Sequence, residues 1–406
     1  MPPHWRSGSE PSIAGTGASH LHESSQQDVE RLRALDGLRG IAVLLVVFYH
    51  AFARWAEPIH ESTLYPHGNA LFVAPWLATF GQIGVLTFFL TSGFVIIWTL
   101  ERSSSIMDFV VRRVARLWPA MLVCATLSTV LINASDVGGY FGVERWNVST
   151  LEYFSSILFL PPNYVAQLFG VAGSHHWVEG VYWTLWHEVR FYALVALVFW
   201  LMPRPRFLWA WAAVQSASTA VLVYGMASDD TAWMQVLAIP LQPDMLSWFT
   251  LGICGYYLWS GRAQLALAFV ALPAVIAVLV AHVFAAAQTD AASMPSLLNN
   301  GQEYIVVALP FALVVARSAL SGLLAWPPLV LIGLISYPLY LFHERPGLVI
   351  MMLGERAGLS PILTVIGAIA LPIAAAYVIH RLVELPGKRL IVSLFMRVKP
   401  GKRYTL

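Results

Sequence analysis

The sequence predicts an all-α integral membrane protein with about ten transmembrane helices. Hydrophobic residues make up 58% of the chain and charged residues only 11%, against roughly 25% charged residues in an ordinary soluble domain. The apolar residues gather in blocks of about 20, the length that a helix needs to cross the hydrocarbon core of a bilayer. Lys and Arg lie mostly between alternate blocks, which is the pattern of cytoplasmic loops.

Ten segments are apolar and long enough to be spanning helices. Their approximate bounds are 38–56, 77–100, 117–134, 182–202, 207–227, 241–259, 264–287, 303–320, 329–352 and 361–380. The sixth is the weakest candidate, because Pro240 and Pro243 interrupt its start. The apolar piece 153–160 is too short to cross, so we expect it to lie at the membrane interface or to re-enter.

Three regions are expected along the chain. Residues 1–30, which are mostly small and polar, are predicted to form a flexible cytoplasmic tail. Residues 31–389 form the transmembrane domain, and residues 390–406 form a basic cytoplasmic tail. With the N-terminus inside, most of the 24 basic residues fall in inner segments. An even number of helices then places both termini in the cytoplasm.

Several protein classes are disfavoured by composition and motifs. A formal net charge of +2 argues against a nucleic-acid binder. The sequence has no Walker loop, no HExxH and no GxSxG, so common nucleotide, metallopeptidase and hydrolase motifs are missing. We expect no metal site and no bound cofactor. Cys124 and Cys254 lie in apolar segments and are predicted to be separate buried thiols.

The first apolar segment carries three groups that are costly inside a membrane helix and therefore indicate function: Asp36, Arg39 and His50. Arg39 and His50 are eleven residues apart, which places them roughly 16 Å apart on nearly the same face. Asp36 lies one turn from Arg39 and can pair with it. The neutral imidazole of His50 can accept a proton near pH 7, or it can merely hydrogen-bond a neighbouring helix.

Two further segments present polar groups at helical spacing. Arg113 and Arg116 would place two guanidiniums on one face, suited to the phosphates of a nucleotide-like donor; anchoring to anionic lipid is the alternative. Glu188 and Tyr192, one turn apart near the predicted outer surface, could position an acceptor hydroxyl. The alternative there is a structural ion pair, of Glu188 with Arg190 or with another helix.

The ninth segment carries a polar stripe on an otherwise apolar helix. Ser336, Tyr340 and His343 fall at positions i, i+4 and i+7, so they are predicted to share one face. Such a face points into the bundle interior. It could line a substrate cavity or hold neighbouring helices together.

These residues lie in six short motifs that follow one another along the chain. The motifs are LDGLRGIA (35–42) with an Arg-x10-His ending at His50, GVLTFFLTSGFVI (84–96), RVARLWP (113–119), WTLWHEVRFY (183–192), SYPLYLFH (336–343) and VELP (383–386). In this order they resemble the membrane acyltransferase-3 family, the bacterial multipass O-acyltransferases. The resemblance extends from about residue 31 to residue 389.

The resemblance implies a bundle of ten or so helices in the bacterial cytoplasmic (inner) membrane. It implies transfer of an acyl group, often acetyl, from cytoplasmic acyl-CoA, as co-substrate, to a hydroxyl of an extracytoplasmic glycan, glycolipid or related acceptor. It also implies that His50 is catalytic, that Arg39 is its basic partner, and that Arg113 and Arg116 lie on the donor side. The expected partners are thus acyl-CoA, the acceptor and the bilayer.

The remaining candidates complete the predicted site. Asp36 and Glu188 are grouped with His50 and Arg39 as catalytic candidates. The residues predicted to line the acceptor site or a cavity are Tyr192, Ser336, Tyr340 and His343.

Two functions from other classes remain as alternatives. A proton-coupled secondary transporter could use Asp36, His50, Glu188 and His343 as a proton relay. Transporters of this kind often contain internal repeats, and none is visible in this sequence. A non-catalytic scaffold of a glycan-assembly complex is the second alternative.

Overall fold

The computed structural model describes residues 16–54, 78–135, 147–227, 232–243, 245–262, 264–288, 302–318 and 321–398. Within these ranges the chain forms helices joined by turns, and it forms no strand. The all-α class predicted from the sequence is confirmed. Residues 1–15 and 399–406, the ends of the two predicted tails, lie outside the described residues.

Long helices make up most of the structure. They are α1 (Thr16–Phe52), α2 (Ala78–Arg102), α3 (Ile106–Ser135), α6 (Trp183–Leu201), α7 (Phe207–Ala227), α9 (Leu246–Trp259), α10 (Leu265–Gln288), α11 (Gln302–Val315) and α16 (Pro361–Ile379). The other elements are α4 (Thr150–Ile157), α5 (Pro162–Leu168), η3 (Gly180–Tyr182), η4 (Arg204–Arg206), α8 (Ala232–Leu241), α12 (Ser321–Leu324), α13 (Pro327–Leu334), α14 (Ser336–Leu341), α15 (Glu344–Arg356), η6 (His380–Glu384) and α17 (Leu385–Val398). Because α1 begins at Thr16, helix extends back into the segment expected to be a tail.

In the described part of the chain, eight helical stretches are long and apolar enough to cross a membrane. They are Arg33–Phe52, Thr79–Arg102, Ile106–Ser135, Gly180–Leu201, Arg204–Ala227, Val236–Trp259, Leu265–Val283 and Pro361–Phe395. The predicted segment 303–320 corresponds to a shorter apolar helix, Tyr304–Val315. The total number of spans and the orientation of the bundle stay predictions.

The predicted segment 329–352 is not one helix. It is divided into α13, α14 and α15, with breaks at Ile335 and at Phe342 and His343. Pro338 and Pro346 each occupy the third position of the helix that follows a break. A missing N–H is tolerated there, because the first N–H groups of a helix have no partner within it.

The break corrects the predicted stripe of Ser336, Tyr340 and His343. Ser336 and Tyr340 belong to α14, whereas His343 lies after the break, immediately before α15. His343 therefore does not share a helix face with the other two. The prediction assumed an unbroken helical period, although the two prolines were visible in the sequence.

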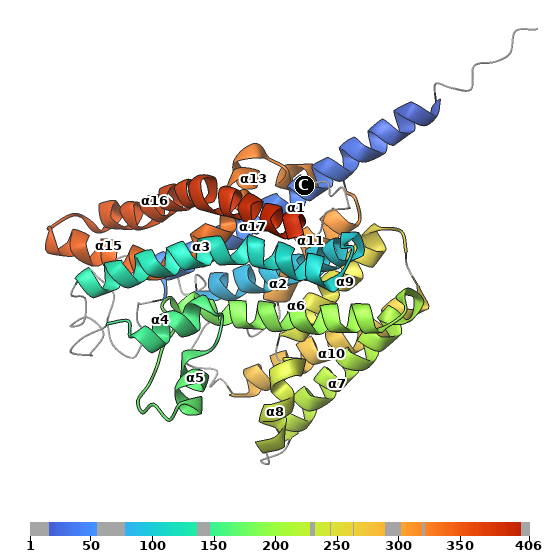
Figure 1. Cartoon of the computed structure of the whole chain (residues 1–406), viewed down its shortest axis with the longest axis horizontal. Coiled ribbons are helices and arrows are strands. Elements are labelled where there is room, and N and C mark those ends of the chain that lie inside the picture. Colours follow the sequence, from blue (N-terminus) through green and yellow to red (C-terminus); the bar gives the residue numbers. More distant parts are fainter. Residues whose placement is uncertain are drawn as a thin grey trace, which may run out of the picture.

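The helices form one elongated bundle (Figure 1). In the view of Figure 1, α2, α3 and α6 cross the middle of the bundle, with α16 and α17 toward one side and α7, α8 and α10 toward the other. Of the three middle helices, α2 packs against α6. The N-terminal part of α1 projects beyond the bundle. Farther along, α1 packs against α2 and α13, while α2 also packs against α9. Cys124 and Cys254 are buried and free, as predicted.

Glycines bring α1 very close to the segment that contains α12 and α13. A Cβ atom on Gly37, Gly40 or Gly333 would lie 1.6, 2.3 or 1.8 Å from a backbone carbonyl oxygen of the facing segment. No side chain fits at those distances, so the two backbones touch directly, as small residues allow in membrane helix pairs. Gly37 and Gly40 flank Arg39, and the contact therefore fixes where this arginine lies.

Replacing Gly40 by Val should separate the two segments and destabilise the bundle. Overpacking of a tight interior typically costs about 1–3 kcal/mol, which should appear as a lower midpoint of thermal unfolding in detergent. Gly322→Val is the matched control, because a Cβ atom on Gly322 would meet no atom within 4 Å. An equal loss of stability in both variants would contradict the glycine contact.

Candidate active site

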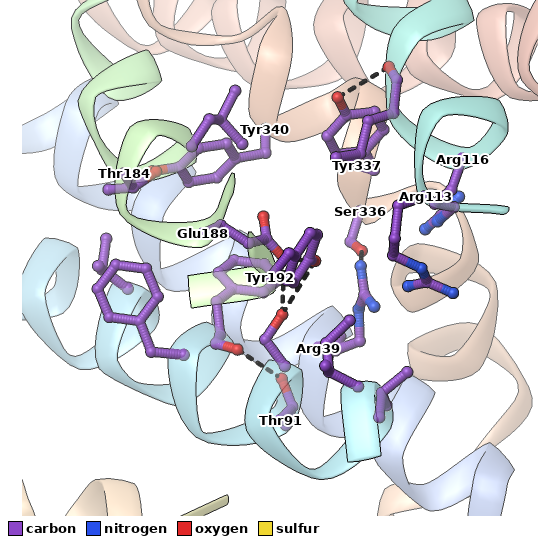
Figure 2. Close-up of a pocket in the computed structure, with 18 residues that line it drawn as sticks. Arg39, Thr91, Arg113, Arg116, Thr184, Glu188, Tyr192, Ser336, Tyr337 and Tyr340 are labelled. Atoms are coloured by element: carbon purple, nitrogen blue, oxygen red, sulfur yellow. Dashed lines mark hydrogen bonds between the residues drawn. The ribbon is translucent and has the colours of Figure 1, made fainter. Parts of the chain in front are cut away.

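A polar pocket lies inside the bundle where α1, α2, α3, α6 and α14 meet (Figure 2). Its volume is about 60 Å³, which is room for roughly four water molecules. Its charged and hydroxyl-bearing lining residues are Arg39, Thr91, Ser92, Arg113, Arg116, Thr184, Glu188, Tyr192, Ser336, Tyr337 and Tyr340. Most of the site residues predicted from the sequence are therefore neighbours in space.

Three arginines from two helices line this pocket. Arg39 on α1 donates a hydrogen bond to Ser336 Oγ at 3.3 Å. Arg113 on α3 donates one to Thr99 Oγ1 at 3.4 Å, and Arg116 follows one turn later. The prediction that Arg113 and Arg116 share one helix face is confirmed. Three guanidiniums around one small space form a site suited to an anionic group.

The partner of Arg116 comes from the C-terminal end of the bundle. Glu384 is 1% exposed, forms an ion pair with Arg116, and accepts a hydrogen bond from His380 Nδ1 at 2.8 Å. It lies in the π-helical turn η6, and such turns are frequent at functional sites. In the sequence, Glu384 was noted only as part of the VELP motif and was given no role of its own. The signal that could have identified it is a carboxylate one helical turn after a histidine, next to a membrane helix.

Glu188 and Tyr192 interact on α6. The Tyr192 hydroxyl donates a hydrogen bond to Glu188 Oε1, and Ser92 Oγ on α2 donates another at 2.6 Å. Arg190 instead donates to Ile239 O at 2.8 Å, so the alternative Glu188–Arg190 pair is not formed. Glu188 lines the same pocket as the arginines, and its role toward the acceptor stays a prediction.

A second cavity, of about 10 Å³, contains His50, His343 and Glu344. His343 Nε2 lies 3.2 Å from His50 Nδ1, and Glu344 Oε1 lies 3.8 Å from His50 Nε2. His50 Nδ1 is also 2.8 Å from Val46 O, and His343 Nδ1 is 3.0 Å from Tyr340 O. Both imidazoles are thus held in fixed orientations.

Two buried glutamates fasten α15 to the start of α6. Glu344 Oε2 accepts a hydrogen bond from Val181 N at 2.9 Å, and Glu179 Oε2 accepts one from Arg345 N at 2.9 Å. A Cβ atom on Gly180 would lie 2.6 Å from Glu344 Oε1, so glycine allows this close approach. Sequence reasoning gave neither glutamate a role, because their partners lie more than a hundred residues away.

Tyr340 lies between the two cavities. Its hydroxyl is 2.8 Å from Thr184 Oγ1 and donates to Val181 O at 3.2 Å. Its ring lies 5.6 Å from the Phe88 ring on the pocket side and 5.9 Å from the His343 ring on the other side. One layer of side chains therefore separates the arginine-lined pocket from His50.

Asp36 is the predicted site residue that lies in neither cavity. It is partly exposed on α1. Among the described residues no ion pair joins Asp36 to Arg39, and Arg39 contacts Ser336 instead. Arg39 and Arg116 interact with the Asp36 carboxylate only by longer-range electrostatic attraction. The expected Asp36–Arg39 pair is therefore not present.

The fold and the site define a polytopic membrane protein that encloses a cationic pocket and a buried histidine pair within its helices. The chain belongs to the acyltransferase-3 family, because the model of that family, described as an acyltransferase domain, matches residues 32–381. This match confirms the family resemblance found in the sequence motifs. The chain is accordingly a membrane acyltransferase.

Several curated proteins are similar to this chain. BcsY of Komagataeibacter xylinus, assigned as a membrane-bound transacylase, is 28% identical over 79% of this chain and 74% of its own length. The O-acetyltransferase OatA of Staphylococcus aureus is 26% identical over 87% of this chain and 57% of its own length. Nodulation protein 10 of Rhizobium leguminosarum is 29% identical over 45% of this chain and 47% of its own length. No solved structure matches.

Glu344 should matter for acyl transfer, because its carboxylate faces His50. We expect Glu344→Gln, which keeps the size of the side chain but removes its charge, to lower transfer about tenfold or more. Gly180→Ala should act in the same direction by displacing this carboxylate. Transfer is measured as the base-labile acyl groups in cell envelopes, since mild alkali releases O-esters. Normal levels in both variants would rule out a role for Glu344.

Proposed function

We propose that this protein transfers an acyl group, acetyl being the simplest, from acyl-CoA to a hydroxyl of a glycan, glycolipid or related acceptor outside the cytoplasmic membrane. The observation that supports it best is the placement of an arginine-lined pocket next to a buried histidine pair within one helix bundle. The activities named for the two relatives, transacylase and O-acetyltransferase, support the same reaction class.

The arginine-lined pocket is the proposed donor site. Arg39, Arg113 and Arg116 would face the phosphates of CoA, because guanidiniums bind such groups through paired hydrogen bonds. A pocket of about 60 Å³ accepts one small group, such as a phosphate or a thioester, and not a whole coenzyme. The bulk of CoA would therefore stay toward the cytoplasmic side, with the thioester reaching past Tyr340 toward His50.

His50 is the proposed general base. Carbonyl oxygens only accept hydrogen bonds, so Val46 O requires the proton of the neutral His50 ring to be on Nδ1. The lone pair of Nε2 is then available to accept a proton. Glu344 Oε1, 3.8 Å from Nε2, lies where it would stabilise the imidazolium that results.

The reaction then follows from these positions. The acceptor hydroxyl gives its proton to His50 Nε2 while its oxygen attacks the thioester carbonyl carbon. The carbon–sulfur bond breaks, and the CoA thiolate leaves and takes the proton from His50. An ester and free CoA are produced, and His50 returns to its neutral form.

The transporter alternative gains no support from the site geometry. Hydrogen bonds connect His50 with His343, but Glu188 is bonded to Ser92 and Tyr192 in the other cavity. Asp36 lies outside both cavities. In the described residues, therefore, the four ionisable groups do not form the continuous relay that a proton-coupled carrier needs.

Replacing His50 by Ala should remove acyl transfer while the protein still inserts in the membrane. Loss of a general base typically lowers a rate by about 10²–10⁴-fold, so base-labile acyl groups in cell envelopes should fall to background. His282→Ala is the matched control, because His282 lies on the membrane-spanning helix α10 and lines neither cavity. Full acyl transfer by the His50 variant would refute the mechanism, and would favour the scaffold alternative.

A further inference from the structure

His343 is held at the end of a short helix by two carbonyl groups. Helix α14 ends at Leu341, and the last C=O groups of a helix lack N–H partners within it. His343 Nδ1 lies 3.1 Å from Leu339 O and 3.0 Å from Tyr340 O. The break between α14 and α15 thus provides acceptors that this imidazole satisfies.

These two contacts determine which nitrogen of His343 carries the proton. A carbonyl oxygen only accepts hydrogen bonds, so Nδ1 must be the N–H group of the neutral ring. Nε2 then has a lone pair and no proton, and it can only accept a hydrogen bond. The nitrogen that it faces is Nδ1 of His50, at 3.2 Å.

The same rule gives His50 the matching donor. Its Nδ1 is 2.8 Å from Val46 O and therefore carries the proton. This N–H group is shared between Val46 O and His343 Nε2. The two ring planes are inclined at 78°, so the imidazoles are not stacked. Each ring is assigned from its own carbonyl contacts, and together the assignments make His50 the donor and His343 the acceptor.

A second proton on this pair belongs on His50. A cationic His343 would turn an Nε2–H group toward the Nδ1–H group of His50, and two donors would face each other across 3.2 Å. Both side chains are buried, so bulk water does not separate them. The free site for a proton is His50 Nε2, which faces Glu344 Oε1 at 3.8 Å.

From this arrangement we infer that His343 is a positioning residue for acyl transfer, which accepts the Nδ1–H of His50 and stabilises the imidazolium form of that base. The inference rests on the proposed function, in which His50 Nε2 takes the proton of the acceptor hydroxyl. As that proton arrives, the hydrogen bond to His343 becomes charge-assisted and roughly twice as strong. His343 itself neither gains nor loses a proton.

This stabilisation acts on the chemical step. The stronger hydrogen bond exists only while His50 carries its charge, so it lowers the barrier and does not strengthen binding of the donor. The arginines of the proposed donor site lie in the other cavity. Loss of the hydrogen bond should therefore lower kcat and leave the KM for the donor unchanged.

Two amide substitutions separate this role from a purely structural one. In His343→Asn the amide nitrogen can take the place of Nδ1 and still bind the end of α14, but no atom reaches the place of Nε2. In His343→Gln the amide oxygen can take the place of Nε2 and accept from His50, while the bonds to the helix end are lost. The positioning role predicts damage from the first substitution and rescue by the second; a purely structural role predicts the reverse.

The variants are assayed as full chains in everted membrane vesicles supplied with radiolabelled acetyl-CoA, and the base-labile label is counted. We expect His343→Asn to lower kcat about 10–100-fold, because a hydrogen bond to a charged group contributes about that factor, with an unchanged KM for acetyl-CoA. His343→Gln should keep most of the rate. Full activity of the Asn variant, or equal losses in both, would overturn the inference.

The hydrogen bond itself can be observed by NMR in the unaltered protein. With histidine labelled by ¹⁵N, an N–H···N bond couples the protonated nitrogen of one ring to the unprotonated nitrogen of the other. We expect one coupled pair, Nδ1–H with Nε2, that disappears in both His343→Gln and His50→Ala. Absence of this coupling, or a proton on His343 Nε2, would show that the assigned donor and acceptor are wrong.

The outcomes also distinguish this inference from the proposed function. If His50→Ala keeps acyl transfer, the proposed base is wrong and the role of His343 fails with it. If His50→Ala abolishes transfer while His343→Asn does not lower it, only the inference is wrong and the general base stands.

Discussion

The direct backbone contact between α1 and the α12–α13 segment determines where both cavities form. Gly37, Gly40 and Gly333 remove the side chains that would keep these segments apart. Arg39 then reaches Ser336 at one level of the bundle, and His50 reaches His343 at another. The spacing between Arg39 and His50 along one rigid helix thus becomes the spacing between the two cavities.

The site carries many ionisable groups, and most are paired across distant parts of the chain. Arg116 is neutralised by Glu384, and Glu344 and Glu179 accept backbone hydrogen bonds. Breaking a buried pair leaves a charge without compensation and costs more than the pair contributes. These contacts therefore hold the bundle in the one arrangement that satisfies them all, and they orient the reacting groups at the same time.

The fold class and much of the polar pocket could be predicted from the sequence, because charged residues stand out in apolar helices. Arg113 and Arg116, or Glu188 and Tyr192, are one turn apart and meet by helical period alone. The roles of Glu344 and Glu384 could not be predicted, because their partners, His50 and Arg116, come from helices far away in the chain. The break at His343 was not predicted, because the long apolar run 329–352 is typical of one spanning helix. Pro338 and Pro346 were the signals of the two shorter helices.

The layer formed by Tyr340 and Thr184 has a consequence for the membrane as a whole. If the donor enters from one side and the acceptor from the other, as proposed, the protein needs polar openings toward both faces of the membrane. If those openings joined, water and ions would cross the membrane and dissipate its potential. That potential is worth about 2.3 kcal/mol per elementary charge for each 100 mV. In the proposed mechanism Tyr340, hydrogen-bonded to Thr184 and Val181, would separate the two openings until a thioester passes it.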